Sequence, residues 1–258
     1  MVIRTLTAND FDAVFDAFND AFSDYVVPFA LTREQLAEML RRRGWVPEAS
    51  AAAFDEERMV AFTLNGIDGD RGYDSGTGVV PTHRRRGLAR ELMLRSIELL
   101  RARGCKTYVL EVIDSNLKAA ELYRSLGFVQ TRTLQCWRFE SEVEETFGAG
   151  HADPEWWDIE PSWQNTTSSI HRAFPHQILG DENAYAVVFA NGDVAQLAVR
   201  PEARRKGLGT RLLHAAMTAA GQPVRLQNVD ERHEGITRFL EAAGATRTVR
   251  QLEMVLAL

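Results

Sequence analysis

The chain has 258 residues, which is enough for one large domain or for two of ordinary size. Apolar residues make up 45% of it and charged residues 26%, a composition typical of soluble globular proteins. The net charge of −6 argues against a general nucleic-acid binder, because neutralising phosphates requires a basic surface.

The first half of the sequence alternates between strand-like runs and amphipathic helices. Phenylalanines at helical spacing mark the first helix, and Thr32 with Gln35 has the form of a capping box at the second. The strand expected over residues 73–80 contains Gly76 and Gly78, and glycine weakens a strand. We interpret both as backbone kept open for a ligand. The expected elements are strand 2–6, helix 9–22, a helix from 32, strands 51–55, 59–67 and 73–80, a helix from 86, strand 107–113, a helix after 116, and strand 128–139.

A basic turn between strand 73–80 and the next helix is the strongest local signal. The first N–H groups of a helix have no partner within the helix, and its dipole places partial positive charge there. Gly87 allows close approach of a phosphate to the main chain, and Arg84, Arg85 and Arg86 add charge around it. This pattern indicates a phosphate-bearing ligand.

The same turn occurs twice. Residues 199–210 repeat the order of residues 79–90, which is an apolar strand, a proline, three basic residues, a glycine and an apolar helix, at an offset of 199 − 79 = 120 residues. A repeat of this length indicates two structural units. The second unit is expected to have fewer elements than the first. They are helix 164–174, a hairpin of strands 184–189 and 194–199, a helix to 220, strand 224–228, a helix to 243 and a last strand to 256.

Residues 141–162 interrupt the pattern with acidic residues, glycines and prolines, and we interpret them as a linker. Trp156 and Trp157 lie within it and Trp163 follows it. Tryptophans are unusual in a free tether, so we expect this segment to pack against one or both units. The expected domains are therefore residues 1–140, the tryptophan-rich linker 141–162, and a second unit at 163–258.

The two motifs of the first unit resemble those of the GNAT superfamily of N-acetyltransferases. Arg84-x-x-Gly87-x-Ala89 is similar to the family's acyl-CoA pyrophosphate loop, and Asn116 to Phe128 is similar to its second cofactor motif. The tandem arrangement is similar to that of two-unit members of the family. The resemblance implies a mixed α/β fold of two GNAT-like units, each with a central mixed sheet flanked by helices, the second truncated at its N-terminal part.

The resemblance also implies acetyl-CoA as co-substrate and assigns residues to it. The backbone of Val79 and Val80 would pair with the pantetheine arm, and Asn116 would hydrogen-bond the amide region of the cofactor. The pyrophosphate would lie in the loop formed by Arg84, Arg85, Arg86, Gly87, Leu88, Ala89 and Arg90. We expect no metal, because Cys105 and Cys136 have no metal-binding spacing and the histidines show no ligand pattern.

Amine attack on a thioester needs a base for the amine, donors for the oxyanion and an acid for the thiolate. Tyr123 stands where the family places its thiolate-protonating tyrosine, or it is a core residue of its helix. Glu111 is the leading base candidate by resemblance, or a strand-end carboxylate that is merely hydrogen-bonded. Asp74, on the strand before the loop, is the rival base, since some family members use a carboxylate there, and it is also a candidate substrate contact. Asp24 and Tyr25 lie where the family builds its amine pocket.

The second unit departs from this pattern at its reactive positions. Leu240 stands at the position of Tyr123, His233 at that of Asn116, and Asn228 at that of Glu111. We therefore expect the first unit to be active and the second to be degenerate. The resulting hypothesis is a cytoplasmic enzyme, acting without a membrane or nucleic acid, that acetylates a primary amine of a small molecule or peptide. A non-catalytic acyl-CoA-binding or structural protein is the alternative.

Overall fold

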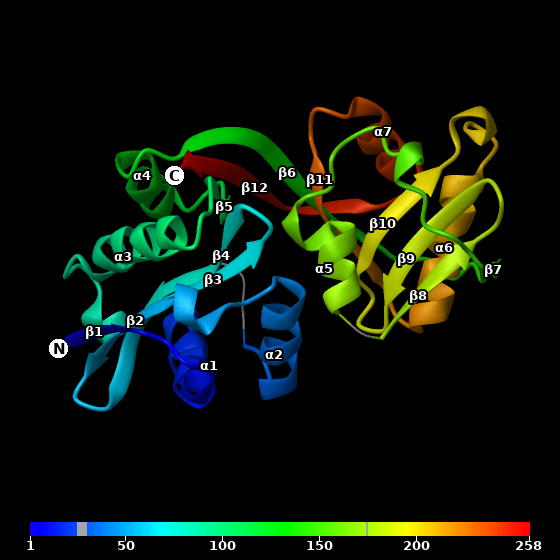
Figure 1. The fold of residues 1–258 in the computed structure, drawn as a ribbon. Helices are drawn as coiled ribbons and strands as arrows, with labels where there is room; N and C mark the ends of the chain where they lie inside the picture. Colours follow the sequence, from blue (N-terminus) through cyan, green and yellow to red (C-terminus); the bar gives the residue numbers. More distant parts are fainter. Residues whose placement is uncertain (25–29, 174) are drawn as a thin grey trace. The chain divides into compact units, whose positions relative to one another are not determined.

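The computed structural model describes residues 1–24, 30–173 and 175–258 (Figure 1). Its contacts divide the chain into two compact units. Unit 1 holds residues 1–112, 116–130 and 254–258, and unit 2 holds residues 113–115 and 131–253. The last five residues of the chain therefore belong to the first unit.

The described part of unit 1 is a sheet with helices on both faces. Its elements are β1 (Val2–Thr5), α1 (Phe11–Ala21), α2 (Arg33–Arg42), β2 (Ala51–Asp55), β3 (Arg58–Asp68), β4 (Arg71–Val79), α3 (Leu88–Ala102), β5 (Thr107–Ile113) and α4 (Leu117–Ser125). The strands follow the order β1-β2-β3-β4-β5, with β4 and β5 parallel and the earlier pairs antiparallel. The mixed α/β character expected from the sequence is confirmed.

Alternation along the strands decides which helix covers which face. On β2, Ala52 and Phe54 pack with α1 and α2, whereas Ala51 and Ala53 pack with α3. Successive side chains of a strand point to opposite faces, so the two helical layers follow from this period of two. The capping box at Thr32 is also confirmed, since its hydroxyl accepts from the backbone N–H of Gln35 and its N–H donates to the Gln35 side chain.

Unit 2 contains the rest of the strands and helices. They are β6 (Val129–Phe139), β7 (Gly148–Ala149), α5 (Thr167–Arg172), β8 (His176–Gly180), β9 (Ala184–Phe189), β10 (Val194–Val199), α6 (Leu208–Ala220), β11 (Val224–Asp230), α7 (Glu234–Ala242) and β12 (Thr246–Ala257), with the ends of β6 and β12 counted in unit 1. Strands β10-β9-β8-β7 form one antiparallel sheet, and β12, β6 and β11 are neighbours in another.

The tryptophan segment, residues 153–166, is part of the fold of unit 2. Ala184, Ala186 and Val188 of β9 pack with α6, whereas the alternate residues pack with α5 and with Trp156 and Trp157. Trp163 is 3% exposed. The prediction that this segment packs against a unit is confirmed, and the segment covers a sheet face of unit 2 as α1 and α2 do in unit 1.

Two local predictions were wrong. The helix expected over 164–174 is shorter, because residues 163–165 form a 3-10 turn and α5 begins after an N-cap at Thr166. Strand β8 was missed altogether. The boundaries at 140 and 162 stay predictions, since the contact units follow packing and not the points at which a domain could be cut.

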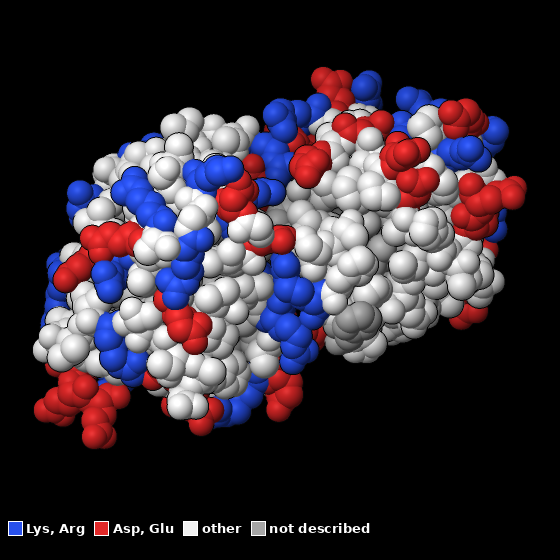
Figure 2. Space-filling view, viewed as in Figure 1, with Lys and Arg blue, Asp and Glu red and all other residues white. Residues whose placement is uncertain are grey.

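Acidic and basic side chains are interspersed on the face of the molecule in Figure 2, in keeping with exposed ion pairs such as Arg58–Asp20 and Arg138–Glu140. Within the described residues, no helix is both long and apolar enough to cross a membrane.

Candidate active site

Strands β4 and β5 of unit 1 separate partway along their length. They pair from Arg71–Thr107 to Tyr73–Val109, and no pair is found beyond this point. The separation coincides with a bulge in β4, because Leu64 faces Gly76 while Asn65 faces Asp74, which leaves Ser75 as the extra residue. Arg43 fixes the bulge by donating to the carbonyl oxygen of Ser75 at 2.8 Å.

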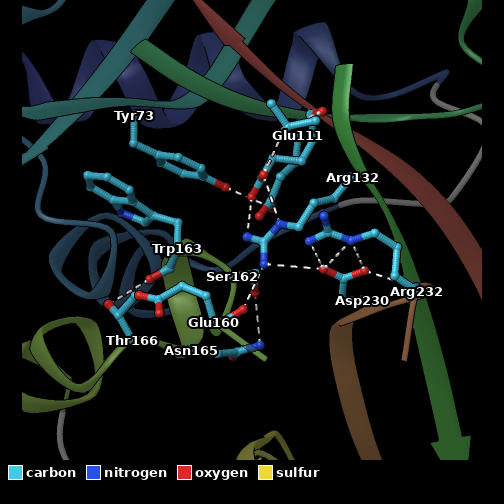
Figure 3. A network of polar contacts seen from close by, with 12 residues as sticks. Tyr73, Glu111, Arg132, Glu160, Ser162, Trp163, Asn165, Thr166, Asp230 and Arg232 are labelled. Carbon is cyan, nitrogen blue, oxygen red and sulfur yellow. Dashed lines mark hydrogen bonds and ion pairs between the residues drawn. The ribbon is translucent and has the colours of Figure 1, made fainter. Parts of the chain in front are cut away.

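Glu111 lies just past this fork, on β5. The Tyr73 hydroxyl, at the last paired position of β4, donates to Glu111 Oε2 at 2.9 Å, as Figure 3 shows. Tyr73 is 2% exposed, and burial together with the Glu111 charge raises the pKa of its phenol well above the usual value. The phenol therefore stays protonated and orients the carboxylate as a fixed donor.

The basic turn has the backbone of an anion site. Gly87 is the N-cap of α3 with φ 80° and ψ −2°, and Arg85 also lies in the left-handed region with φ 63°. The first helical hydrogen bond joins the N–H of Glu91 to the carbonyl of Gly87 at 3.1 Å. The N–H groups of Leu88, Ala89 and Arg90 precede it and have no acceptor within the helix.

The arginines of the turn are used differently from one another. Arg84 pairs with both carboxylate oxygens of Asp24 at 2.7 Å and also donates to the carbonyls of Val79 and Ala21. This contact lowers the pKa of Asp24. Arg86 donates to the Thr82 carbonyl at 3.4 Å. Arg84 thus ties the end of α1 to the loop, and its guanidinium is directed at Asp24.

Asp74 is buried within the bulge of β4 and is 8% exposed. Its carboxylate accepts from the N–H of Gly76 at 2.9 Å and from the Thr77 hydroxyl at 2.8 Å. Burial raises the pKa of Asp74 to about 6, against the opposing effect of these two hydrogen bonds. The carboxylate supports the turn of the bulge from inside the sheet.

The second cofactor motif forms the start of α4. Asn116 is the N-cap of α4, and its side-chain oxygen accepts a hydrogen bond from the N–H of Ala119 at 3.3 Å. The side-chain NH₂ group takes no part in this cap. Tyr123 is 7% exposed, and its ring stands edge-on to Phe128 at 5.8 Å between centroids. Val79 and Val80 face β3 on one side, through the Val79–Ala61 pair and the Val80 N–H bond to Val60.

Among the residues predicted for the site, Tyr25 lies outside the described part of the chain. The structure brings Glu111 to Tyr73 and Asp24 to Arg84; neither contact was predicted from the sequence, and Tyr73 was not singled out. No sequence motif marks Tyr73, because its contact with Glu111 depends on the parallel register of β4 and β5. Over residues 1–24, 30–173 and 175–258, no group of three His, Cys, Asp or Glu side chains is arranged to hold a metal.

The family of the chain follows from comparison with known proteins. The sequence profile of the acetyltransferase (GNAT) family matches residues 11–128 and 140–245. The [ribosomal protein bS18]-alanine N-acetyltransferase of Salmonella typhimurium is 41% identical over 73 residues, which are 28% of this chain and 49% of the relative. Mycothiol acetyltransferase of Thermobifida fusca is 34% identical over 118 residues, covering 42% of this chain and 36% of the relative. The chain thus spans half or less of the length of these curated relatives.

Solved structures agree on the two-unit fold. A putative acetyltransferase from Pyrococcus horikoshii superposes on 100% of this chain and 89% of its own with a TM-score of 0.75 at 15% identity. A tandem GNAT protein from the clavulanic acid biosynthesis pathway superposes on 99% of this chain and 98% of its own with a TM-score of 0.69 at 18% identity. With a family match in each half and a tandem neighbour of the same fold, the chain belongs to the acetyltransferase (GNAT) family as a two-unit member.

Proposed function

We propose that unit 1 transfers the acetyl group of acetyl-CoA to a primary amine. The observation that carries the proposal is the fork of β4 and β5, where Tyr73 holds Glu111, together with the helix terminus that follows the other end of β4. Beyond Tyr73, the edge of β4 that faces away from β3 has no strand partner in the described register, so an extended chain of amides can pair with it. The pyrophosphate then lies on the N–H groups of Leu88 to Arg90.

In this arrangement the amine nitrogen attacks the thioester carbon. Glu111 accepts the proton that the amine loses as the new C–N bond forms. Collapse of the tetrahedral intermediate breaks the C–S bond, and the Tyr123 hydroxyl gives its proton to the departing thiolate. Unit 2 lacks both groups, because Asn228 and Leu240 stand at the positions of Glu111 and Tyr123.

For the acceptor we propose a peptide or small-molecule amine. The curated relatives include a ribosomal-protein alanine N-acetyltransferase and an N-alpha-acetyltransferase, and these matches cover 28% and 25% of this chain. Asp24 stays a proposed substrate contact. Its carboxylate would bind the substrate while it is also paired with Arg84.

The proposal is tested by thioester cleavage with acetyl-CoA and a panel of amines, from N-terminal alanine peptides to polyamines. Tyr123→Phe and Glu111→Gln should each lower kcat by about 100-fold or more, as expected for loss of a general acid or base.

Tyr108→Phe is the matched control, because Tyr108 is a buried β5 tyrosine whose hydroxyl is bonded to Asn65 at 2.5 Å. It should alter stability and leave kcat largely unchanged. If acetyl-CoA binds but no amine is consumed by the wild-type protein, the non-catalytic alternative replaces the proposal.

A further inference from the structure

One peptide group of the β4 bulge is held by side chains at both of its polar atoms. The carbonyl of this group belongs to Ser75, which is 4% exposed, and its N–H belongs to Gly76. Arg43 donates to the carbonyl at 2.8 Å, and Asp74 accepts from the N–H at 2.9 Å. Buried peptide groups of a strand are ordinarily satisfied by the neighbouring strands. Here two side chains fix the orientation of the peptide, and one of them comes from a helix.

Arg43 reaches this peptide from the C-terminal end of α2, where it is the C-cap residue. That end is itself fixed to β3. The N–H of Ile67 bonds to the carbonyl of Gly44 at 3.0 Å. Trp45 and Gly66 form an antiparallel bridge beside this bond. Gly66 also lacks the Cβ that would collide with the carbonyl oxygen of Arg43. The backbone of Arg43 is therefore held directly against the strand that pairs with the bulge.

The bulge decides to which face of the sheet Tyr73 points. If Ser75 entered the ladder as an ordinary residue, the residues before it would move by one position relative to β3. Such a shift turns each side chain to the opposite face, and Tyr73 would leave Glu111. The guanidinium carbon of Arg43 also lies 5.9 Å from the centroid of the Tyr73 ring, within the range of a cation–π contact. Arg43 thus contacts both ends of the stretch from Tyr73 to Ser75.

We propose that Arg43 is a positioning residue for the acetyl transfer of unit 1, because it holds the bulge and the Tyr73 ring so that the phenol stays on Glu111. The inference rests on the proposed function, since it requires Glu111 to act as the base. Arg43 acts through Tyr73 and not on the reacting atoms.

The equivalent bulge of unit 2 is held by a neutral amide. The register shifts between Val194 and Gln196, which leaves Ala195 as the extra residue, 195 − 75 = 120 positions after Ser75. Gln196 Nε2 donates to the carbonyl of Asn165 in the tryptophan segment at 2.8 Å. A bulge of this kind therefore does not require a charged donor. The guanidinium of unit 1 is distinguished by its second contact, with the ring of the tyrosine that holds Glu111.

Steady-state kinetics of acetyl transfer test the inference. Arg43→Met removes the charge and the donors from a long side chain, so kcat should fall about tenfold as Tyr73 and Glu111 lose their fixed geometry. KM for acetyl-CoA should change by less than about twofold, because the pyrophosphate turn follows the other end of β4. Arg43→Lys keeps a charged donor and should give a kcat between those of Arg43→Met and the wild type. Arg41→Met is the matched control, since Arg41 is exposed in the same turn of α2, and it should leave kcat unchanged.

A double-mutant cycle separates positioning from a general loss of stability. Tyr73→Phe by itself should lower kcat by about the same factor as Arg43→Met. In the Tyr73→Phe background, Arg43→Met should lower kcat by less than about twofold, because the hydroxyl that it orients is gone. If the two losses multiply in full, Arg43 does not act through Tyr73 and the inference is overturned. Urea unfolding identifies a variant that does not fold, and Arg43→Lys then takes the place of Arg43→Met in the cycle.

The inference and the proposed function fail in different ways. An active wild-type protein whose kcat responds to neither substitution at Arg43 overturns the inference alone. A wild-type protein that binds acetyl-CoA and consumes no amine overturns the proposed function, and the inference with it.

Discussion

Single residues set the geometry around the fork of β4 and β5. Gly78 was interpreted as room for a ligand, but a Cβ there would lie 2.6 Å from the Phe62 ring and 2.9 Å from Ala21, so its absence lets α1 pack closely. Gly87 has the positive φ that favours glycine, whereas its predicted contact with a phosphate stays a prediction. The Arg84–Asp24 and Tyr73–Glu111 contacts join residues 60 and 38 positions apart, and no local pattern encodes them.

Asp74 should give the protein a measurable dependence of stability on pH. Its pKa of about 6 exceeds the ordinary 3.8, so the folded state binds more protons between these values, and stability falls as pH rises from about 4 to about 6. The full effect corresponds to about 3 kcal/mol. Asp74→Asn should lack this component, which comparison of urea unfolding at pH 7 and pH 4.5 for both proteins will measure.

Asp70→Asn is the control, because Asp70 is exposed near the same end of β4 and Lys106 lowers its pKa. Its effect should be small and opposite in sign. If wild type and Asp74→Asn gain or lose stability in parallel between the two pH values, Asp74 does not titrate as its burial requires.

At the scale of elements, two apolar runs on either side of a tight-turn sequence were predicted at their observed bounds, residues 184–189 and 194–199. Strand β8 was missed because its five residues, His176–Gly180, begin next to a proline, end in a glycine and carry no alternation of apolar and polar residues. The segment interpreted as a linker packs against unit 2, as its tryptophans predicted, although its composition does not reveal its individual contacts. Its prolines and acidic residues suit a tether, yet Trp156 and Asp158 supply to Arg204 the contacts that Ala21 and Asp24 supply to Arg84.

Arg132 of β6 should be the principal anchor of this segment. It pairs with Glu253 and donates to the carbonyl of Glu160 at 2.7 Å, as Figure 3 shows for Arg132 and Glu160. The side chains of Arg132 and Glu253 are 9% and 7% exposed, so Arg132→Leu leaves a buried carboxylate uncompensated and should cost about 3–5 kcal/mol of unfolding free energy.

Arg138→Leu, on the same strand, breaks only the exposed pair with Glu140 and should cost about 0–1 kcal/mol in the same denaturant titration. The double variant Arg132→Leu with Glu253→Leu should recover much of the loss. If Arg132→Leu and Arg138→Leu lower the free energy of unfolding equally, the buried contacts of Arg132 do not stabilise the protein more than an exposed pair does.

On the scale of the whole molecule, the duplication was predictable and the path of the chain was not. Two turns 120 residues apart announce two units, but the assignment of Met254–Leu258 to unit 1 depends on pairing between distant parts of the sequence. Met254 is fully buried, and the N–H of Leu258 bonds to the carbonyl of Lys106 at 2.8 Å. A fragment cut after the first family match would lack these contacts.

Met254→Ala should therefore destabilise unit 1 from the far end of the sequence, by about 2–5 kcal/mol. Native-state hydrogen exchange should report lost protection in β5, while β9 of unit 2 keeps its own. Val255→Ala, at the next and half-buried residue, should have a smaller effect. Lost protection confined to β9 would contradict the assignment.

The tryptophan segment has an optical consequence. Of the five tryptophans, Trp45 alone precedes β6, and Trp156 and Trp157 line a cavity of about 700 Å³ in unit 2. The indole emission of the protein therefore comes mainly from its second half, and two of those indoles border the space that a ligand would fill. A ligand that entered this cavity would change the intrinsic fluorescence, and that signal is distinct from the thiol release that the proposed acetyl transfer in unit 1 would produce.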